Sequence, residues 1–231
     1  MTLLLTILQT ITEWDAQVFL FLNNFHHRFA DDVMYLASDK WVWVPFYASL
    51  LYMIYRSIGF KATLISLLAI TMLIVATDQI SANLLKDLVQ RLRPSNPDNP
   101  LSANVHIVNG YRGGRYGFPS SHAANSFGLI MFIMLLFRSH VLALFCLFWA
   151  LLVCYSRIYL GVHYIGDIIG GMLIGMFSAV IVYYGLRKIM RRYYYKQNRK
   201  FRFNPTNVTM PLSIGLITIV FILSVALFRN I

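Results

Sequence analysis

Long runs of apolar residues, separated by short polar stretches, dominate the hydrophobicity pattern of the chain. A helix that crosses a bilayer needs about 20 mostly apolar residues. The segments that approach this length are 41–58, 62–85, 119–138, 139–159, 164–186 and 210–228. The pattern therefore predicts an all-α protein, a polytopic membrane bundle of about six transmembrane helices.

The N-terminal stretch is also apolar, but Gln9, Glu13 and Asp15 interrupt it. It lacks the basic start and the small-residue cleavage site of a signal peptide. We expect residues 1–40 to form an interfacial segment with an amphipathic helix lying on the membrane surface. A seventh span is the alternative.

The composition excludes a soluble globular domain. Hydrophobic residues make up 58% of the 231 residues and charged residues only 13%, whereas a soluble domain is about one quarter charged. A soluble chain of this length has no core large enough to bury so much apolar surface.

The basic residues gather on one side of the predicted bundle. The net charge is +11, and the stretch 187–203 contains eight Lys and Arg residues and no acid. The positive-inside rule places this stretch in the cytoplasm and the loops 86–118 and 157–163 outside. Aromatic residues interleave with the cations, as in nucleic-acid binders, but beside a span anionic lipid headgroups are the expected partner, not nucleic acid.

The first group of candidate functional residues lies at the outward end of the second span. Lys86 and Arg93 are seven residues apart, nearly two helical turns, so they share one face of a helix. Pro94 disfavours helix at the residue before it and marks the exit. Two cations on one face suit a phosphate, and interfacial snorkelling is the alternative.

The second group, Phe118-Pro119-Ser120-Ser121-His122, directly precedes an apolar helix. Pro followed by Ser is typical of a helix start, and the unpaired amides of helix N-termini bind anions. His122 then lies in the first turn, beside whatever the amides hold. An ordinary capping role is the alternative.

The third group contains Ser156, Arg157, His163 and Asp167. His163 and Asp167 are four apart and share a helix face. A carboxylate bonded to one imidazole nitrogen leaves the other free to attack or to take a proton. We expect no metal, because a metal site needs three or more ligands and no His-Glu-x-x-His pattern is present.

Together the outward loops offer three cations, two histidines and one orienting carboxylate. Phosphoryl transfer needs this combination: charge on the equatorial oxygens, a nucleophile in line, and an acid for the leaving oxygen. Fixed cations and helix amides can stabilise that charge. The sequence thus predicts phosphoryl transfer without a cofactor.

These residues resemble the type 2 phosphatidic acid phosphatase superfamily, the lipid phosphate phosphatases. Its signature is Lys-x6-Arg-Pro, then Pro-Ser-Gly-His, then Ser-Arg-x5-His-x3-Asp. The corresponding stretches here are Lys86-x6-Arg93-Pro94, Pro119-Ser120-Ser121-His122 and Ser156-Arg157-x5-His163-x3-Asp167. The chain is identified as a bacterial membrane-bound member of this superfamily.

The resemblance implies a role for each matching residue. His163 would be the nucleophile that forms a phosphohistidine, oriented by Asp167. His122 would be the general acid and later the base that activates water. The phosphate ligands would be Lys86, Arg93, Ser120, Ser121 and Arg157, with help from the backbone amides at 120–122. The catalytic core would then cover 41–186, followed by a basic cytoplasmic loop at 187–209 and an extra transmembrane helix at 210–231.

One position departs from the family pattern, because Ser121 stands where Gly is usual. If the family needs Gly here for a positive φ, Ser121 strains the loop. If the family needs Gly only so that the backbone can approach the phosphate, the Ser121 hydroxyl adds a hydrogen-bond donor. Arg112 and Arg115 precede the second motif and suggest a headgroup with more than one anionic group, or a lipid-facing anchor.

The function expected is a metal-independent lipid phosphatase at the outer face of a bacterial cytoplasmic membrane. Undecaprenyl diphosphate, lipid A phosphates and phosphatidylglycerophosphate all fit as substrates. One alternative is a lipid-linked phosphotransferase that uses the same histidine. The other is a non-enzymatic phospholipid-binding transporter, although the inverted repeats and broken helices of transporters are not seen in the sequence. Soluble haloperoxidases share the motifs but not the apolar spans.

Overall fold

The computed structural model describes residues 2–195 and 207–230. Within these ranges every regular element is a helix, which confirms the all-α prediction. The longer helices, in chain order, are α1 (Thr2–Asn23), α2 (Arg28–Ser38), α3 (Val44–Ile58), α4 (Phe60–Asp78), α6 (Ser121–Phe137), α7 (His140–Tyr159), α8 (Ile165–Tyr195) and α9 (Thr209–Asn230). The shorter ones are the π-helix η1 (Gln79–Leu85), α5 (Lys86–Val89) and the 3-10 helix η2 (Pro100–Asn104).

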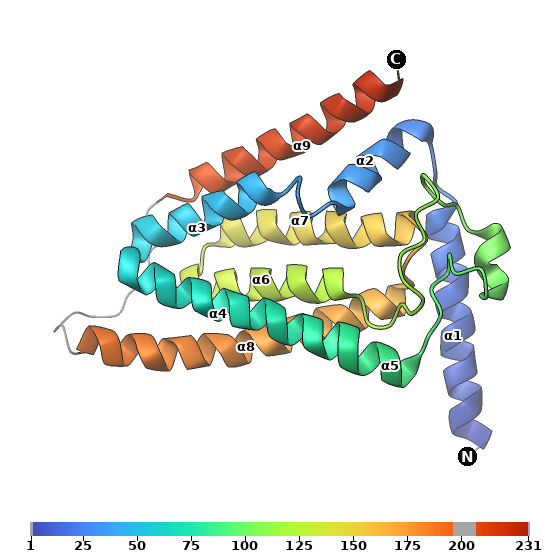
Figure 1. The fold of residues 1–231 in the computed structure, drawn as a ribbon, viewed down its shortest axis with the longest axis horizontal. Coiled ribbons are helices and arrows are strands. Elements are labelled where there is room, and N and C mark those ends of the chain that lie inside the picture. Colours follow the sequence, from blue (N-terminus) through green and yellow to red (C-terminus); the bar gives the residue numbers. More distant parts are fainter. Residues whose placement is uncertain (1, 196–206, 231) are drawn as a thin grey trace.

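The helices form a bundle suited to a membrane. Helices α3, α4, α6, α7 and α8 run side by side, and α9 packs against α2 and α3 (Figure 1). The helices long and apolar enough to cross a bilayer are Phe60–Val89, His140–Tyr159, Ile165–Arg192 and Thr209–Asn230. The predicted spans 41–58 and 119–138 correspond to the shorter helices α3 and α6, of 15 and 17 residues.

Two predicted boundaries differ from the structure. The span expected from residue 41 begins at Val44, because residues 40–43 form a turn ahead of Pro45. The loop expected at 187–209 is helical through Tyr195, since no Gly or Pro interrupts the chain there before Pro205. The rest of that loop up to residue 206 lies outside the described residues.

Helix α1 crosses one end of the bundle at a steep angle to the other helices (Figure 1). It contacts α7 and α8 there, and the 90–120 segment gathers at the same end. Helix α1 therefore does not run parallel to the long apolar helices. Its placement along the membrane surface stays a prediction.

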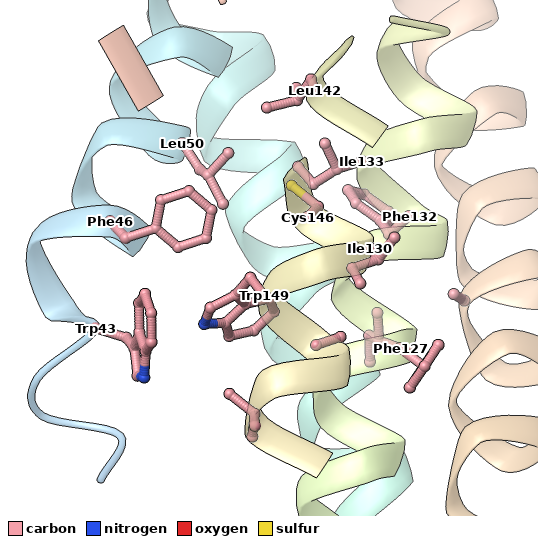
Figure 2. Packing of buried hydrophobic residues seen from close by; sticks show 14 of the residues in the cluster. Trp43, Phe46, Leu50, Phe127, Ile130, Phe132, Ile133, Leu142, Cys146 and Trp149 are labelled. Atoms are coloured by element: carbon pink, nitrogen blue, oxygen red, sulfur yellow. The ribbon is translucent and has the colours of Figure 1, made fainter. Parts of the chain in front are cut away.

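Aromatic and branched side chains fill the centre of the bundle. At the start of α3, the Trp43 ring packs edge-on against Trp149 of α7 with 6.0 Å between the ring centroids. The Phe46 ring is tilted against the same Trp149 ring at 5.6 Å (Figure 2). Phe132 and Ile133 of α6 close the cluster from the other side. This packing holds α3, α6 and α7 in fixed register, and with them the residues at the ends of α6 and α7.

Glycines allow α6 and α8 to approach very closely. A Cβ added at Gly175 of α8 would lie 2.1 Å from the Ala124 carbonyl oxygen of α6, and one at Gly171 would lie 2.2 Å from that of Ser120. Side chains at these positions would force the helices apart. The contact therefore sets the distance between the starts of α6 and α8, which carry the second and third motifs.

The second span ends irregularly. Its last turns form the π-helix η1, which continues into α5. Gln90 then takes a left-handed conformation with φ 50°, and its N–H donates to the Lys86 carbonyl. The helix therefore ends at Val89 and not at Pro94, so the expectation that Lys86 and Arg93 share one helix face is wrong. The residues after this stop pair with 115–117, where Leu92 and Tyr116 form an isolated antiparallel bridge.

Candidate active site

The start of α6 is tied directly to the start of α8. The Ser120 N–H donates to the Asp167 carbonyl at 2.9 Å, and the Ser120 hydroxyl oxygen accepts from Ala123 N–H as the N-cap of α6. Of the three amides predicted to hold phosphate, the one at Ser120 is therefore already engaged. Its hydroxyl hydrogen remains able to donate, because the cap uses the oxygen only as an acceptor.

His163 and Asp167 form a buried pair at the start of α8. The imidazole Nδ1 lies 3.4 Å from Asp167 Oδ2, which also accepts the Tyr164 N–H at 3.0 Å. Only 1% of His163 and none of Asp167 is exposed. With Nδ1 facing the carboxylate, Nε2 is the nitrogen left for chemistry.

His163 is held in its neutral form. Burial, and then the nearby cations Arg93 and Arg157, keep the pKa of the imidazole well below its usual value. A neutral imidazole has the lone pair that nucleophilic attack requires. The environment thus favours His163 as a nucleophile rather than as an acid.

Two buried arginines face this pair with unused donors. Arg93 Nε donates to the Tyr116 carbonyl at 3.1 Å, while Arg157 donates to the Ser38 hydroxyl and, at 3.1 Å, to the Tyr111 hydroxyl. Arg93 Nη1 and Arg157 Nε have no hydrogen-bond partner among the described residues. A buried donor without a partner costs roughly 1–3 kcal/mol, so these two atoms are suited to an anionic ligand.

Arg93 remains a cation in spite of its environment. Burial, and then repulsion from Arg157, lower the pKa of Arg93 to about 10. The guanidinium is therefore still charged at pH 7. Paired cations of this kind stabilise the charge on the oxygens of a transferring phosphoryl group.

Lys86 reaches the same site from the second span. Its Nζ donates to the Ser121 hydroxyl oxygen at 3.4 Å, and Ser121 is the first residue of α6. This contact brings together the first and second motifs. The three cations predicted from the sequence thus surround the start of α6 and His163.

His122 lies at the edge of the site and at one end of a large cavity. It is close enough to Arg157, His163, Arg93 and Lys86 for electrostatic interaction. The cavity has a volume of about 700 Å³ and runs between α3, α4, α6 and α7. Its wall is mostly apolar, with Ser121 and His122 of α6 among the polar lining residues and Leu50, Ile54 and Ile133 among the apolar ones.

The loop before α6 lies directly against the candidate site residues Arg93 and Asp167. Gly113 has φ +68°, and a Cβ there would lie 2.4 Å from Arg93 Nη1; a Cβ at Gly117 would lie 2.7 Å from Asp167 Oδ2. A larger residue at either position would displace the cation or the carboxylate. These glycines were not assigned a role from the sequence. The cluster of glycines ahead of the second motif was the feature that could have pointed to them.

Arg112 and Arg115 lie in this loop but point to protein partners. Arg112 donates to the Ser95 carbonyl, and Arg115 forms an exposed ion pair with Asp98 at 3.6 Å. Arg115 also lies over the Tyr116 ring. Their role toward a headgroup stays a prediction.

Several supporting residues are absent from the sequence motifs. Arg91 donates to Asp167 Oδ1 at 3.0 Å and pairs with Asp15 of α1 at 2.7 Å. Ser38 and Tyr111 hold Arg157. Asp15 could have been noticed in the sequence, because it is a carboxylate within an apolar stretch. No feature of the sequence pointed to Ser38 or Tyr111.

Among the described residues, no group of three or more His, Cys, Asp or Glu side chains is arranged to hold a metal ion. Metal independence itself stays a prediction that activity measurements must test. The cations that the sequence offered in place of a metal, Lys86, Arg93 and Arg157, do lie together.

Comparison with known proteins decides the family. A family model described as the PAP2 superfamily matches residues 62–191, more than half of the chain. The chain belongs to the PAP2 superfamily. This family, the apolar helices and the two relatives described next together show a membrane-bound lipid phosphatase, which confirms the enzyme class expected from the motifs.

Curated relatives of this PAP2 protein include two bacterial enzymes. A lipid A 4'-phosphatase of Bacteroides thetaiotaomicron is 44% identical over 185 residues, which cover 80% of this chain and 82% of that protein. A lipid A 4'-phosphatase of Porphyromonas gingivalis is 35% identical over 176 residues, covering 76% and 74%.

A solved structure supports the same fold. The crystal structure of a transmembrane PAP2-type phosphatidylglycerolphosphate phosphatase from Bacillus subtilis superposes with a TM-score of 0.54. It covers 84% of this chain and 90% of that one, at 18% sequence identity. At this identity the likeness concerns the helical fold alone.

Proposed function

We propose that this PAP2 protein removes the 4'-phosphate of lipid A through a phosphohistidine intermediate at His163. The assignment of the substrate rests on the similarity to two lipid A 4'-phosphatases, which are 44% and 35% identical over most of the chain. The apolar cavity that begins at His122 supports a lipid substrate, since it offers acyl chains a dry surface beside the cations.

The first chemical step is attack of His163 Nε2 on the phosphorus atom. As the N–P bond forms, the bond between phosphorus and the lipid oxygen breaks. Arg93 and Arg157 hold the phosphoryl oxygens through the donors that lack a protein partner. Asp167 holds the Nδ1 proton and stabilises the positive charge that develops on the ring.

The leaving oxygen takes a proton from His122, and the second step reverses that role. Neutral His122 accepts a proton from water, and the resulting hydroxide attacks the phosphohistidine. The N–P bond breaks, inorganic phosphate leaves, and His163 returns to its neutral form. The order of proton transfers follows from microscopic reversibility of general acid–base catalysis.

The test is phosphate release from purified protein in detergent, with lipid A that carries both phosphates. We expect mass spectrometry to show loss of the 4'-phosphate and retention of the 1-phosphate. His163→Asn should abolish release and also a radioactive, acid-labile phosphate label on the protein. His140→Asn, which changes an exposed histidine at the start of α7, is the matched control and should behave like the parent. Release from the 1-position or from glycerophospholipids alone would refute the substrate.

We also propose that the site faces the periplasm from the bacterial cytoplasmic membrane. The positive-inside rule supports this orientation, because Arg187, Lys188, Arg191 and Arg192 lie at the far end of α8 from the active site. In a background in which the buried Cys146 and Cys154 are replaced by alanine, Asn109→Cys should react with an impermeant maleimide in intact cells stripped of their outer membrane. A cysteine in place of Arg191 should react only after lysis; the reverse pattern would contradict the orientation.

A further inference from the structure

The carboxylate of Asp167 has two oxygens with different partners. Oδ2 faces His163 and accepts the Tyr164 N–H, whereas Oδ1 accepts a hydrogen bond from Arg91 Nη1 at 3.0 Å. None of Asp167 is exposed to solvent. Water therefore does not reach Oδ1 while Arg91 is in place, and the guanidinium supplies a positive charge beside this buried carboxylate.

Arg91 continues this contact to the N-terminal helix. Its Nη2 lies 2.7 Å from Asp15 Oδ2, so the two terminal nitrogens bind two different carboxylates. The guanidinium also lies over the Tyr164 ring, 4.0 Å from its centroid. A planar group held at two edges and one face has little freedom to turn.

Asp15 is fixed in turn by the start of α8. Its two carboxylate oxygens accept the Gly166 N–H at 3.0 and 3.2 Å, a capping contact supplied by another helix. A Cβ at Gly166 would lie 2.6 Å from Asp15 Oδ2, so only glycine permits this approach. The chain of contacts thus runs from α1 through Arg91 to the carboxylate behind His163.

We infer that Arg91 is a positioning residue for phosphoryl transfer at His163, and that Asp15 of α1 holds Arg91 in place. The inference rests on the proposed function, because it concerns the same nucleophile. Arg91 fixes the rotation of the Asp167 carboxylate, so that Oδ2 points at His163 Nδ1 and the ring presents Nε2 to the phosphate. The sequence motifs contain neither Arg91 nor Asp15 as a functional residue.

Two other roles for Arg91 predict different behaviour. A phosphate ligand would need a free donor edge, but both terminal nitrogens of Arg91 are bound to carboxylates. Loss of a phosphate ligand would raise KM and could lower kcat as well, whereas loss of a positioning residue lowers kcat and leaves KM nearly unchanged. A purely structural tie between α1 and α8 would change thermal stability without affecting turnover of the folded protein.

The experiment compares Arg91→Gln and Asp15→Asn with Arg229→Gln in the full-length protein. Arg229 of α9 pairs with Asp32 of α2 at 3.2 Å, so its variant removes an inter-helix ion pair away from the active site. For Arg91→Gln we expect kcat to fall roughly 10–100-fold, the usual effect of removing a partner that orients a functional histidine. KM should stay within about threefold, since no substrate contact is lost. Asp15→Asn should show a smaller fall in kcat, and Arg229→Gln none.

Chemical rescue separates positioning from structural damage. Arg91→Ala leaves a space for methylguanidinium, which can bridge both carboxylates as Arg91 does. Adding it should restore kcat with saturation, while methylammonium, which cannot bridge them in a planar fork, should restore less. Melting temperatures measured on the same samples report the stability of each variant.

Three results would overturn the inference. One is a kcat within threefold of the parent for Arg91→Gln, and another is a loss that appears only in KM. The third is a fall in kcat that methylguanidinium does not restore and that accompanies a lower melting temperature. An unchanged kcat in Asp15→Asn would remove Asp15 from the assignment. Because His163→Asn tests the phosphohistidine separately, an inactive His163→Asn with a fully active Arg91→Gln refutes only the present inference.

Discussion

Ser121 is the position where the chain departs from the family motif, and the structure makes a sharp prediction about it. Ser121 is the first residue of α6. The described non-glycine residues with positive φ are Gln90, Asn109 and Arg138. The backbone at Ser121 is therefore unstrained, and the strain hypothesis is wrong. Replacing Ser121 with glycine should not stabilise the protein.

The magnitude follows from helix propensity and from one contact. Ser to Gly within a helix costs up to about 0.5 kcal/mol, which lowers the melting temperature of a protein of this size by roughly 1–2 °C. The Ser121 hydroxyl also accepts the Lys86 ammonium at 3.4 Å. Because it lies beside a cation at the start of α6, we expect it to donate to a phosphoryl oxygen. Loss of one such donor can lower kcat about 100-fold.

The assay is steady-state phosphate release from lipid A by Ser121→Ala and Ser121→Gly, with melting temperatures of both. Ser139→Ala is a control for loss of a hydroxyl at a helix start away from the site, because Ser139 caps α7 as Ser120 caps α6. Loss of this cap should cost about 1 kcal/mol of stability and leave kcat unchanged. Both Ser121 variants turning over within threefold of the parent would refute a role for the hydroxyl. A gain of 1 kcal/mol or more in Ser121→Gly would refute the unstrained backbone.

Three further predictions concern stability and inhibition. His163 stays neutral in the folded protein while the unfolded imidazole binds a proton below about pH 6.5, so folding stability present above that pH is lost as pH falls. Between pH 7.5 and 5.5 the loss should be about 1.4 kcal/mol larger for the parent than for His163→Gln in denaturant titrations. Gly175→Ala should destabilise the protein by roughly 2 kcal/mol, because the added methyl group overpacks the contact with α6. Gly185→Ala is the control: a Cβ there meets nothing within 4 Å, so this change should stabilise the protein by about 0.5–1 kcal/mol. Equal effects of the two variants in melting experiments would contradict the close contact between α6 and α8. Chelator should leave phosphate release intact and vanadate should inhibit it, since Lys86, Arg93 and Arg157 supply the charge; loss of activity in chelator that magnesium restores would point to a metal site instead.

The sequence determined the helical membrane fold because the length of an apolar run decides whether a segment can cross a bilayer. Such a run can be recognised in the sequence without knowing which helices pack against it. The two shortest predicted spans, which correspond to α3 and α6, show the limit of this reasoning. Their first residues depend on the turn before Val44 and on the cap at Ser120. The helical extension of α8 to Tyr195 was missed for the same reason: nothing local separates a basic helix from a basic loop.

The sequence also determined the principal groups of the site, because phosphoryl transfer restricts which side chains can serve. Lys86, His122 and Asp167 lie at the ends of helices, whereas Arg93 and His163 lie in the segments beside those ends. The structure brings all five side chains together. Whether they perform the expected steps is for the activity measurements to decide.

Only the tertiary structure decided what holds these groups in position. Arg91 and Asp167 are 76 residues apart, and Asp15 and Gly166 are 151 apart. Residues that make contacts of this kind have no periodic spacing in the sequence, so no sequence pattern predicts these contacts. The conformation of Ser121 likewise depended on where α6 begins, a choice fixed by the Ser120 cap and its bond to the Asp167 carbonyl. Side-chain chemistry could be recognised locally, whereas its orientation came from helices that meet only in the folded bundle.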